Sequence, residues 1–429
     1  MKKKYRIILY TSIFLLCVVA SIILVVKKSN SVYEEESKPK VVKHKSMLSM
    51  NLEQTAGSGD YKTVTQSSWP TEGYKFNAEL SKCENGSTLS WDDTKKAVIV
   101  SGNLSDKCYV YFDIYQPTLA EYIKSQYTGT QGENNIYYHD SDLANGAGDN
   151  SYRYAGANPN NFVCFGTIES PCPIDNLYRI IGVFGENYHG ANGKQLVKLI
   201  KYDYMTTDEL GTDGDYSQTY KEWGMDSTYK GTYGDGERIG VYYWNYKATG
   251  SATNTWSTSL LNKTNLNTNF INNIGTTWAN KIATVTWKVG GNTWANIGTK
   301  TSSVAYTNEI TNPVTTNTTD NATTYSAKIG LMYVSDYGFA ASPDAWTLTM
   351  SSYNNTTATN NNWMYMGLYE WTISRNAGTS DLAFLVYYDG GVGSYYMNGG
   401  SGVRASFNLE SSVSYVSGSG SMSDPIVIN

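Results

Sequence analysis

Histidine is scarce in this chain, with only 3 among 429 residues. Because histidine is the commonest metal ligand and the usual general base near neutral pH, this scarcity excludes a multi-histidine metal centre. The C-terminal body holds only His189, which stands in a turn-like segment without a nucleophile motif nearby. We therefore expect no catalytic histidine, and we expect His139 to lie on the surface.

Charged residues are also few. They make up 17% of the chain, and the formal net charge is −5. Proteins that bind nucleic acid neutralise its phosphates with clustered lysine and arginine, whereas the basic clusters here are short and lie near the N-terminus. This composition argues against a nucleic-acid partner.

Cysteine occurs 5 times and never after Cys172. Cys17 lies in an apolar segment, and the other four form two local pairs, Cys83 with Cys108 and Cys164 with Cys172. An even number of cysteines in an exported chain favours disulfides. Four cysteines allow three disulfide pairings, and the pairing of sequence neighbours needs the least rearrangement of the chain. The alternative is that all four are free thiols. No CxxC spacing or nearby histidine indicates zinc.

Tyrosine, tryptophan and glycine are abundant, with 37, 11 and 39 residues. Aromatic residues favour pleated, half-buried surfaces, and glycine supplies turns between strands. The composition predicts an α+β fold that is mostly β.

Residues 1–28 are predicted to form a signal anchor. Ile7–Val26 is an uncharged run of about 20 residues, enough to span a membrane as a helix. The basic residues before it favour a cytoplasmic N-terminus and an extracellular remainder at the cell membrane. A cleaved signal peptide and a type IV pilin leader are alternatives. Residues 29–60 are polar and are predicted to be a flexible stalk.

Short alternating runs fill residues 61–118, and turn signals such as Asn85-Gly86 separate them. This spacing predicts a small β-sandwich, which a Cys83–Cys108 disulfide would stabilise. The run WP…GYKF…CENGS…LSWD…CYVYFD resembles the small immunoglobulin-like spacer modules of Gram-positive bacterial surface proteins. The resemblance implies a structural spacer.

Residues 119–160 are predicted to be a connector with one short helix near its start and a polar loop after it. Asp140, Asp142 and Asp149 could hold calcium, but their spacing does not match an EF-hand. We prefer a solvated loop.

The body, residues 161–429, opens with a hairpin whose second strand includes Arg179–Phe184. Trp256–Ile274 has the pattern of a helix. A terminal strand ending at Ile428 is predicted to pair with Arg179–Phe184 and so join the two ends of the domain.

Four segments of this body, LYRIIGVF, IGLMYVSDYGFA, EWTIS and GVRASFNL…GSGSMSDPIVI, together look like a C-terminal domain of uncharacterised bacterial surface proteins. That domain is similar to the C-type-lectin-like fold shared with formylglycine-generating enzymes. The resemblance implies a mixed α+β fold with joined termini and long loops. The enzymatic relatives use late cysteines or several histidines, which are absent here. In the motif of calcium-dependent lectins Trp-Asn precedes Asp, whereas Tyr246 follows Trp244-Asn245 here. No enzymatic activity, cofactor or metal is therefore expected.

Aromatic residues remain as candidate ligand contacts near the end of the chain. Exposed tyrosine and tryptophan among Asn, Ser and Gly provide contact area at a low entropic cost. For most of these rings the simpler interpretation is that they fill the core. The predicted ligand-binding residues are Trp363, Tyr365, Trp371, Tyr388 and Tyr396.

These observations predict a membrane-anchored extracellular binding or adhesion protein with a non-catalytic recognition domain for a glycan or protein ligand. One alternative is a pilin-like or cell-wall structural subunit. Another is a glycan hydrolase that uses two carboxylates, although the sequence spacing selects no pair among Asp336, Asp344, Glu370 and Asp389.

Overall fold

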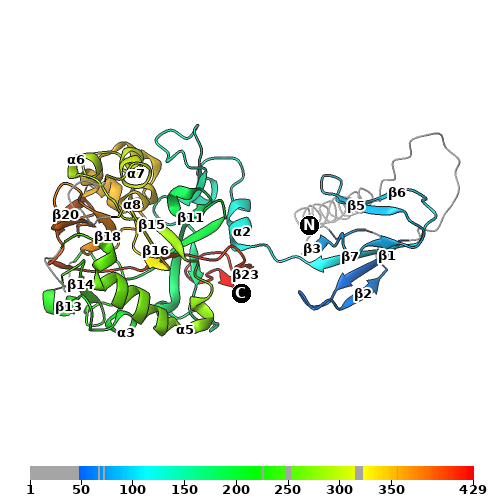
Figure 1. Ribbon diagram of the computed structural model, residues 1–429, viewed down its shortest axis with the longest axis horizontal. Coiled ribbons are helices and arrows are strands. Elements are labelled where there is room, and N and C mark those ends of the chain that lie inside the picture. The colour runs from blue at the N-terminus through cyan, green and yellow to red at the C-terminus, as the bar shows by residue number, and fades with distance from the viewer. Residues whose placement is uncertain are drawn as a thin grey trace, which may run out of the picture. The chain divides into compact units, whose positions relative to one another are not determined.

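Strands dominate the chain and short helices lie between them, which confirms the predicted mostly β, α+β class (Figure 1). The computed structural model describes residues 48–65, 68–70, 73–224, 227–246, 253–314, 322–354 and 356–429. No helix within these ranges is long and apolar enough to cross a membrane. The predicted anchor, Ile7–Val26, lies outside them. The chain divides into two units, Met1–Gln116 and Pro117–Asn429.

The first unit is a small β domain. Its main sheet has the order β2-β1-β7-β3, with β4 also paired to β7, and β5 and β6 form a separate hairpin. Strand β1 runs parallel to β7 and antiparallel to β2. The strands are β1 (Leu48–Glu53), β2 (Tyr61–Val64), β3 (Tyr74–Phe76), β4 (Lys82–Cys83), β5 (Thr88–Asp92), β6 (Ala97–Ser101) and β7 (Cys108–Ile114).

This unit begins earlier than the expected residue 61. Strand β1 lies inside residues 29–60, which were predicted to be a flexible stalk. It forms because Met50 and Leu52 alternate with polar residues and are buried in the core, with exposed fractions of 5% and 6%. They pack with Val98, Val110 and Phe112. A five-residue core this small gains from a covalent link.

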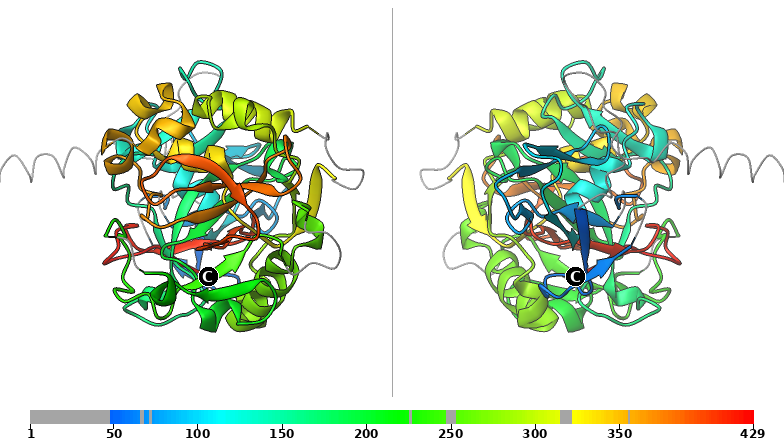
Figure 2. Two further views of the ribbon diagram at one scale, coloured as in Figure 1. Left: turned by 90° about the vertical axis from the view of Figure 1, so that its left-hand side faces the viewer. Right: turned by 90° about the vertical axis from the view of Figure 1, so that its right-hand side faces the viewer.

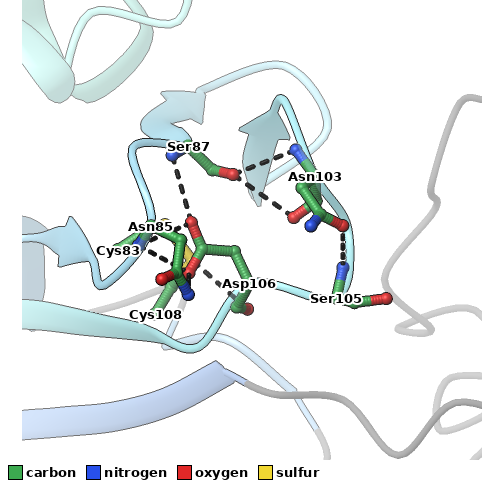
Figure 3. The surroundings of a disulfide bond; sticks show 7 residues. All are labelled: Cys83, Asn85, Ser87, Asn103, Ser105, Asp106 and Cys108. Carbon is green, nitrogen blue, oxygen red and sulfur yellow. Dashed lines mark hydrogen bonds between the residues drawn. A yellow bond between two sulfur atoms is a disulfide. The ribbon is translucent and has the colours of Figure 1, made fainter.

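Both predicted disulfides are present. Cys83 and Cys108 are direct cross-strand partners, with Cα atoms 3.9 Å apart. Beside them the carboxylate of Asp106 accepts hydrogen bonds from the backbone N–H groups of Asn85 and Ser87, at 2.9 and 3.1 Å (Figure 3). The carboxylate thereby orders the turn that follows the disulfide.

The second unit is built on an antiparallel sheet of order β17-β22-β12-β11-β9-β8, with β10 also paired to β11. All residues of the central strands β11 and β12 are buried. The strands of this sheet are β8 (Ile136–His139), β9 (Ser151–Tyr154), β10 (Phe162–Cys164), β11 (Leu177–Phe184), β12 (Leu196–Lys201), β17 (Ile329–Gly330) and β22 (Ser406–Asn408).

Smaller sheets surround this one, in the combinations β13-β14-β21, β18-β19-β20, β15-β16 and β23-β24. The orange strands β18–β20 cross the face toward the viewer in the left view of Figure 2. The strands of these smaller sheets are β13 (Tyr216–Thr219), β14 (Gly240–Tyr243), β15 (Val285–Lys288), β16 (Thr324–Ala327), β18 (Glu370–Arg375), β19 (Leu382–Val386), β20 (Val392–Tyr396), β21 (Gly400–Ser401), β23 (Tyr415–Ser417) and β24 (Val427–Ile428).

Helices gather at two ends of the second unit. Figure 1 shows α6, α7 and α8 together at one end and α3 and α5 at the other, with β11, β15 and β16 between. The α-helices are α2 (Leu119–Ser125), α3 (Thr207–Leu210), α4 (Tyr220–Trp223), α5 (Ile271–Ala279), α6 (Trp294–Ile297), α7 (Ser302–Tyr306), α8 (Val334–Ala340) and α9 (Thr356–Asn360).

Short 3-10 and π-helical segments occur throughout this unit. The predicted Trp256–Ile274 helix corresponds to η4, η5 and the start of α5. These segments are η1 (Glu133–Asn135), η2 (Ile174–Asn176), η3 (Asn187–His189), η4 (Trp256–Thr258), η5 (Leu261–Phe270), η6 (Thr307–Thr311), η7 (Pro343–Thr347) and η8 (Met350–Asn354).

The predicted connector, residues 119–160, is part of this second unit. Helix α2 starts where expected, with a capping box between Thr118 and Glu121, and it buries Leu119 and Ile123 in the core. Strands β8 and β9 extend the main sheet. The segment after α2 was predicted to be a solvated loop because its residues are mostly polar, and the presence of β8 and β9 there differs from that prediction.

The two ends of the unit do meet, although not through the predicted strand pair. Thr118 bridges Ser414, and Ile426 bridges Val163 of β10. The last strand, β24, pairs with β23. The predicted pairing with Arg179–Phe184 is wrong because β12 occupies one edge of β11 and β9 and β10 occupy the other.

Candidate functional site

The predicted ligand-binding aromatics separate into three environments. Trp371 is fully buried and donates its indole N–H to the carbonyl of Tyr242, so it presents no surface to a ligand. Tyr388 and Tyr396 are exposed, at 39% and 57%. Trp363 and Tyr365 are 3% and 6% exposed, yet both line an open hollow.

That hollow, here called the Arg179 pocket, has a volume of about 490 Å³. Loop residues before β10, strand β11, the segment after α4 and the segment around α9 all contribute to it. Its walls are formed by Ala157, Asn158, Pro159, Asn160, Phe162, Arg179, Tyr202, Lys230, Asn360, Asn362, Trp363, Tyr365, Met366 and Met422.

Arg179 is the single charge in the apolar strand LYRIIGVF, and it is only 5% exposed. Its guanidinium lies between two rings, 4.3 Å from the centroid of Phe162 and 4.6 Å from that of Trp363. It donates to the Asn161 side chain at 2.7 Å and to the carbonyls of Trp363 and Pro159 at 3.2 and 3.1 Å. These acceptors are all neutral, and burial lowers the pKa of Arg179 to about 9.

A second cation, Lys230, stands at the mouth of the pocket. Its ammonium lies 4.5 Å from the centroid of the Tyr365 ring and donates to the carbonyl of Thr359 at 3.3 Å. Partial burial lowers the pKa of Lys230. The Tyr365 hydroxyl is itself held by the carbonyl of Tyr388, which fixes the ring beneath the cation.

Amide side chains complete the rim. Asn158, Asn160 and Asn360 are exposed, and within the described ranges none of the three makes a side-chain hydrogen bond. Asn362 is buried and donates to the carbonyl of Tyr337 at 2.9 Å. The pocket thus combines aromatic surface, free amides and two positive charges, an arrangement suited to a polar ligand with an apolar face.

A second hollow, here called the Trp294 groove, has a volume of about 460 Å³. Trp294 and Tyr387 form its aromatic walls, and Asp389 is its acidic residue. The Trp294 ring lies directly on Gly298, where an added Cβ would fall 2.0 Å from it. The groove is also lined by Ser351, Asn354, Gly391, Val392, Gly393 and Ser394.

Both histidines that sequence patterns placed in turns or on the surface are buried. The prediction for His139 is wrong: it is 0% exposed, and its Nδ1 accepts from the N–H of Ala147 at 3.1 Å. His189 is 4% exposed. Burial lowers the pKa of both imidazoles. A buried neutral histidine next to the core has no access to a substrate in this conformation.

Asp149 is also buried, although a solvated loop was expected. Arg153 donates to its carboxylate at 2.6 Å, and the His189 Nε2 lies 3.2 Å from the same oxygen. Burial alone would raise the pKa of Asp149, but Arg153 and His189 hold it well below its ordinary value. Nearby, Lys198 pairs with Asp336. The buried carboxylates of Asp149 and Asp336 are thus each paired with a buried cation.

The four candidate carboxylates of a hydrolase have different surroundings. Asp336 and Glu370 are buried in ion pairs, the latter with Arg404 at 2.8 Å. Asp344 is exposed, and Asp389 lines the Trp294 groove. Neither hollow has two carboxylates among its described lining residues. Among the described residues no group of three or more His, Cys, Asp or Glu is arranged to hold a metal ion.

Sequence patterns did not identify Arg179, Lys230 or Tyr202 as site residues. One sequence feature could have indicated Arg179, because it is an isolated charge in an otherwise apolar strand. A charge buried in such a strand needs a specific polar environment. No sequence pattern marked Lys230 or Tyr202, because one lysine in a polar loop and one tyrosine at the end of a strand are common in any chain.

Comparison with known proteins found no protein-family model, no curated protein and no solved structure that matches the chain.

Proposed function

We propose that this chain is a membrane-anchored extracellular binding protein, in which residues 117–429 form a C-type-lectin-like recognition domain without catalytic activity. The first unit serves as a spacer from the membrane, to which Ile7–Val26 attaches the chain. The observation that carries the proposal is the Arg179 pocket, where aromatic rings, exposed amides and two cations that form no ion pair among the described residues line one hollow. Its volume lies in the range of about 300–1,000 Å³ typical of small-ligand pockets.

The alternative of a carboxylate hydrolase has less support, because it requires two carboxyl groups about 5–10 Å apart in one cleft. Among the described lining residues, the Arg179 pocket has no carboxylate and the Trp294 groove has one. The pilin-like alternative depends on the N-terminal segment, which lies outside the described residues.

A screen of the detergent-solubilised full chain against glycan and protein panels tests the proposal. We expect a ligand of micromolar affinity, and we expect Tyr202→Ala and Asn360→Ala to weaken its binding at least tenfold. Tyr396→Ala is the matched control, because Tyr396 is exposed but does not line the pocket. A screen without a binder would refute the recognition function, and loss of binding in the control alone would place the site on β20.

A further inference from the structure

The lining of the Arg179 pocket has a marked charge imbalance. Among the residues that the structure describes, it includes two cations, Arg179 and Lys230, and no aspartate or glutamate. The chain as a whole carries a net charge of −5, so this imbalance does not follow from composition. In a partly enclosed hollow, such charges interact with a ligand more strongly than they would in open solvent.

Among the described residues of the second unit, four other buried cations are each paired with a carboxylate. A fifth, Arg375, forms no ion pair among these residues and donates to the carbonyl of Val314. Arg179 differs from it in that Arg179 lines an open pocket. The neutralised pairs are Arg153–Asp149, Lys198–Asp336, Lys201–Glu209 and Arg404–Glu370.

A buried cation without a carboxylate partner is costly for the folded protein. Within the described residues, the Arg179 guanidinium contacts two ring faces and three neutral acceptors, and none of these neutralises its charge. Lys230 likewise forms no ion pair among the described residues and contacts a ring and a carbonyl. An anionic group in the pocket would compensate both cations at once.

The remaining lining indicates what carries that anion. Asn158, Asn160 and Asn360 offer amide donors and acceptors suited to hydroxyl groups. Tyr202, which is half-buried, offers ring surface suited to the C–H face of a pyranose. An acidic peptide would use the cations but would leave most of these amides without hydroxyl partners.

We infer that the Arg179 pocket binds an acidic sugar, whose carboxylate or sulfate lies against Lys230 and Arg179 while its hydroxyls meet the asparagine rim. This inference rests on the proposed recognition function and specifies its ligand class.

The test measures equilibrium binding of the full chain by calorimetry to four probes. These are a glucuronic-acid disaccharide, the same disaccharide with glucose in its place, a sulfated disaccharide and tetraglutamate. We expect one of the two acidic disaccharides to bind at least tenfold more tightly than the neutral one. The stronger of the two identifies carboxylate or sulfate as the anion. The preference should shrink when the salt concentration rises from 50 to 500 mM.

Lys230→Met should reduce the preference to less than tenfold, because only Arg179 then remains to attract the anion, and Lys230→Arg should retain the preference because it keeps the charge. Lys194→Met is the control, since Lys194 is exposed and does not line the pocket. Equal binding of acidic and neutral disaccharides would overturn this inference and leave the recognition function standing. Tighter binding of tetraglutamate would overturn the sugar assignment. Binding of none of the four would overturn the inference, and the broader screen would then decide the recognition function separately.

Discussion

Removal of the Cys83–Cys108 disulfide should destabilise the first unit more than removal of Cys164–Cys172 destabilises the second. The bonds close loops with sequence separations of 25 and 8 residues. On the chain-entropy model these loops correspond to about 3.5 and about 2.5 kcal/mol of stabilisation at 25 °C. The first unit has only a small core, so the loss of 3.5 kcal/mol is a large share of a domain's usual stability.

Hydrogen–deuterium exchange of the full chain, read by mass spectrometry, measures each unit separately. In the Cys83→Ala/Cys108→Ala variant, the slowest amides of β7 should exchange about 300-fold faster, since 1.4 kcal/mol corresponds to a factor of ten. The amides of β11 should keep their rates. Alanine is preferred to serine because Cys108 is fully buried and a hydroxyl there would need a partner.

The Cys164→Ala/Cys172→Ala variant is the matched control. It should accelerate exchange in β11 by at most about 60-fold, the equivalent of 2.5 kcal/mol, and leave β7 unchanged. An acceleration of β7 below tenfold in the first variant, or equal effects of either variant on both units, would refute the loop-entropy reasoning.

Three further predictions concern the second unit and are measured by chemical denaturation. Trp371→Ala should cost about 3–5 kcal/mol because the ring is fully buried, whereas Tyr396→Ala should stay within about 0.5 kcal/mol; similar costs would contradict the burial of one and exposure of the other. Lys198→Met should cost about 3 kcal/mol because it leaves the buried Asp336 carboxylate with only the Arg153 guanidinium, 3.7 Å away, as a cationic partner; a cost below 1 kcal/mol would contradict the importance of the Lys198 pair. Burial lowers the pKa of His189, so the unfolded chain binds the extra proton first; stability should therefore fall as the pH drops below about 6.5, and His189→Gln should reduce that fall. An identical pH profile in the variant would remove His189 from this account.

Local chemistry was predictable from neighbouring residues. Thr118 and Glu121 are three positions apart, which is the spacing of a capping box, and the expected helix starts there. The cysteine pairs are close in sequence, so their pairing needed little knowledge of the fold. Strand β11 was recognisable from its apolar run, because a strand buried on both faces needs apolar residues on both.

The sequence by itself determined the mostly β class and strand β11, and it favoured the local cysteine pairing, because each depends on residues that are neighbours in the chain. Only the tertiary structure decided that Trp371 is core, that Asp149 is buried beside Arg153, and that Arg179 and Lys230 line one hollow. The pocket draws its walls from segments more than 200 residues apart, from Ala157 to Met422. A local pattern carries no record of which distant segments will pack together, so the site could be located only once the chain was folded.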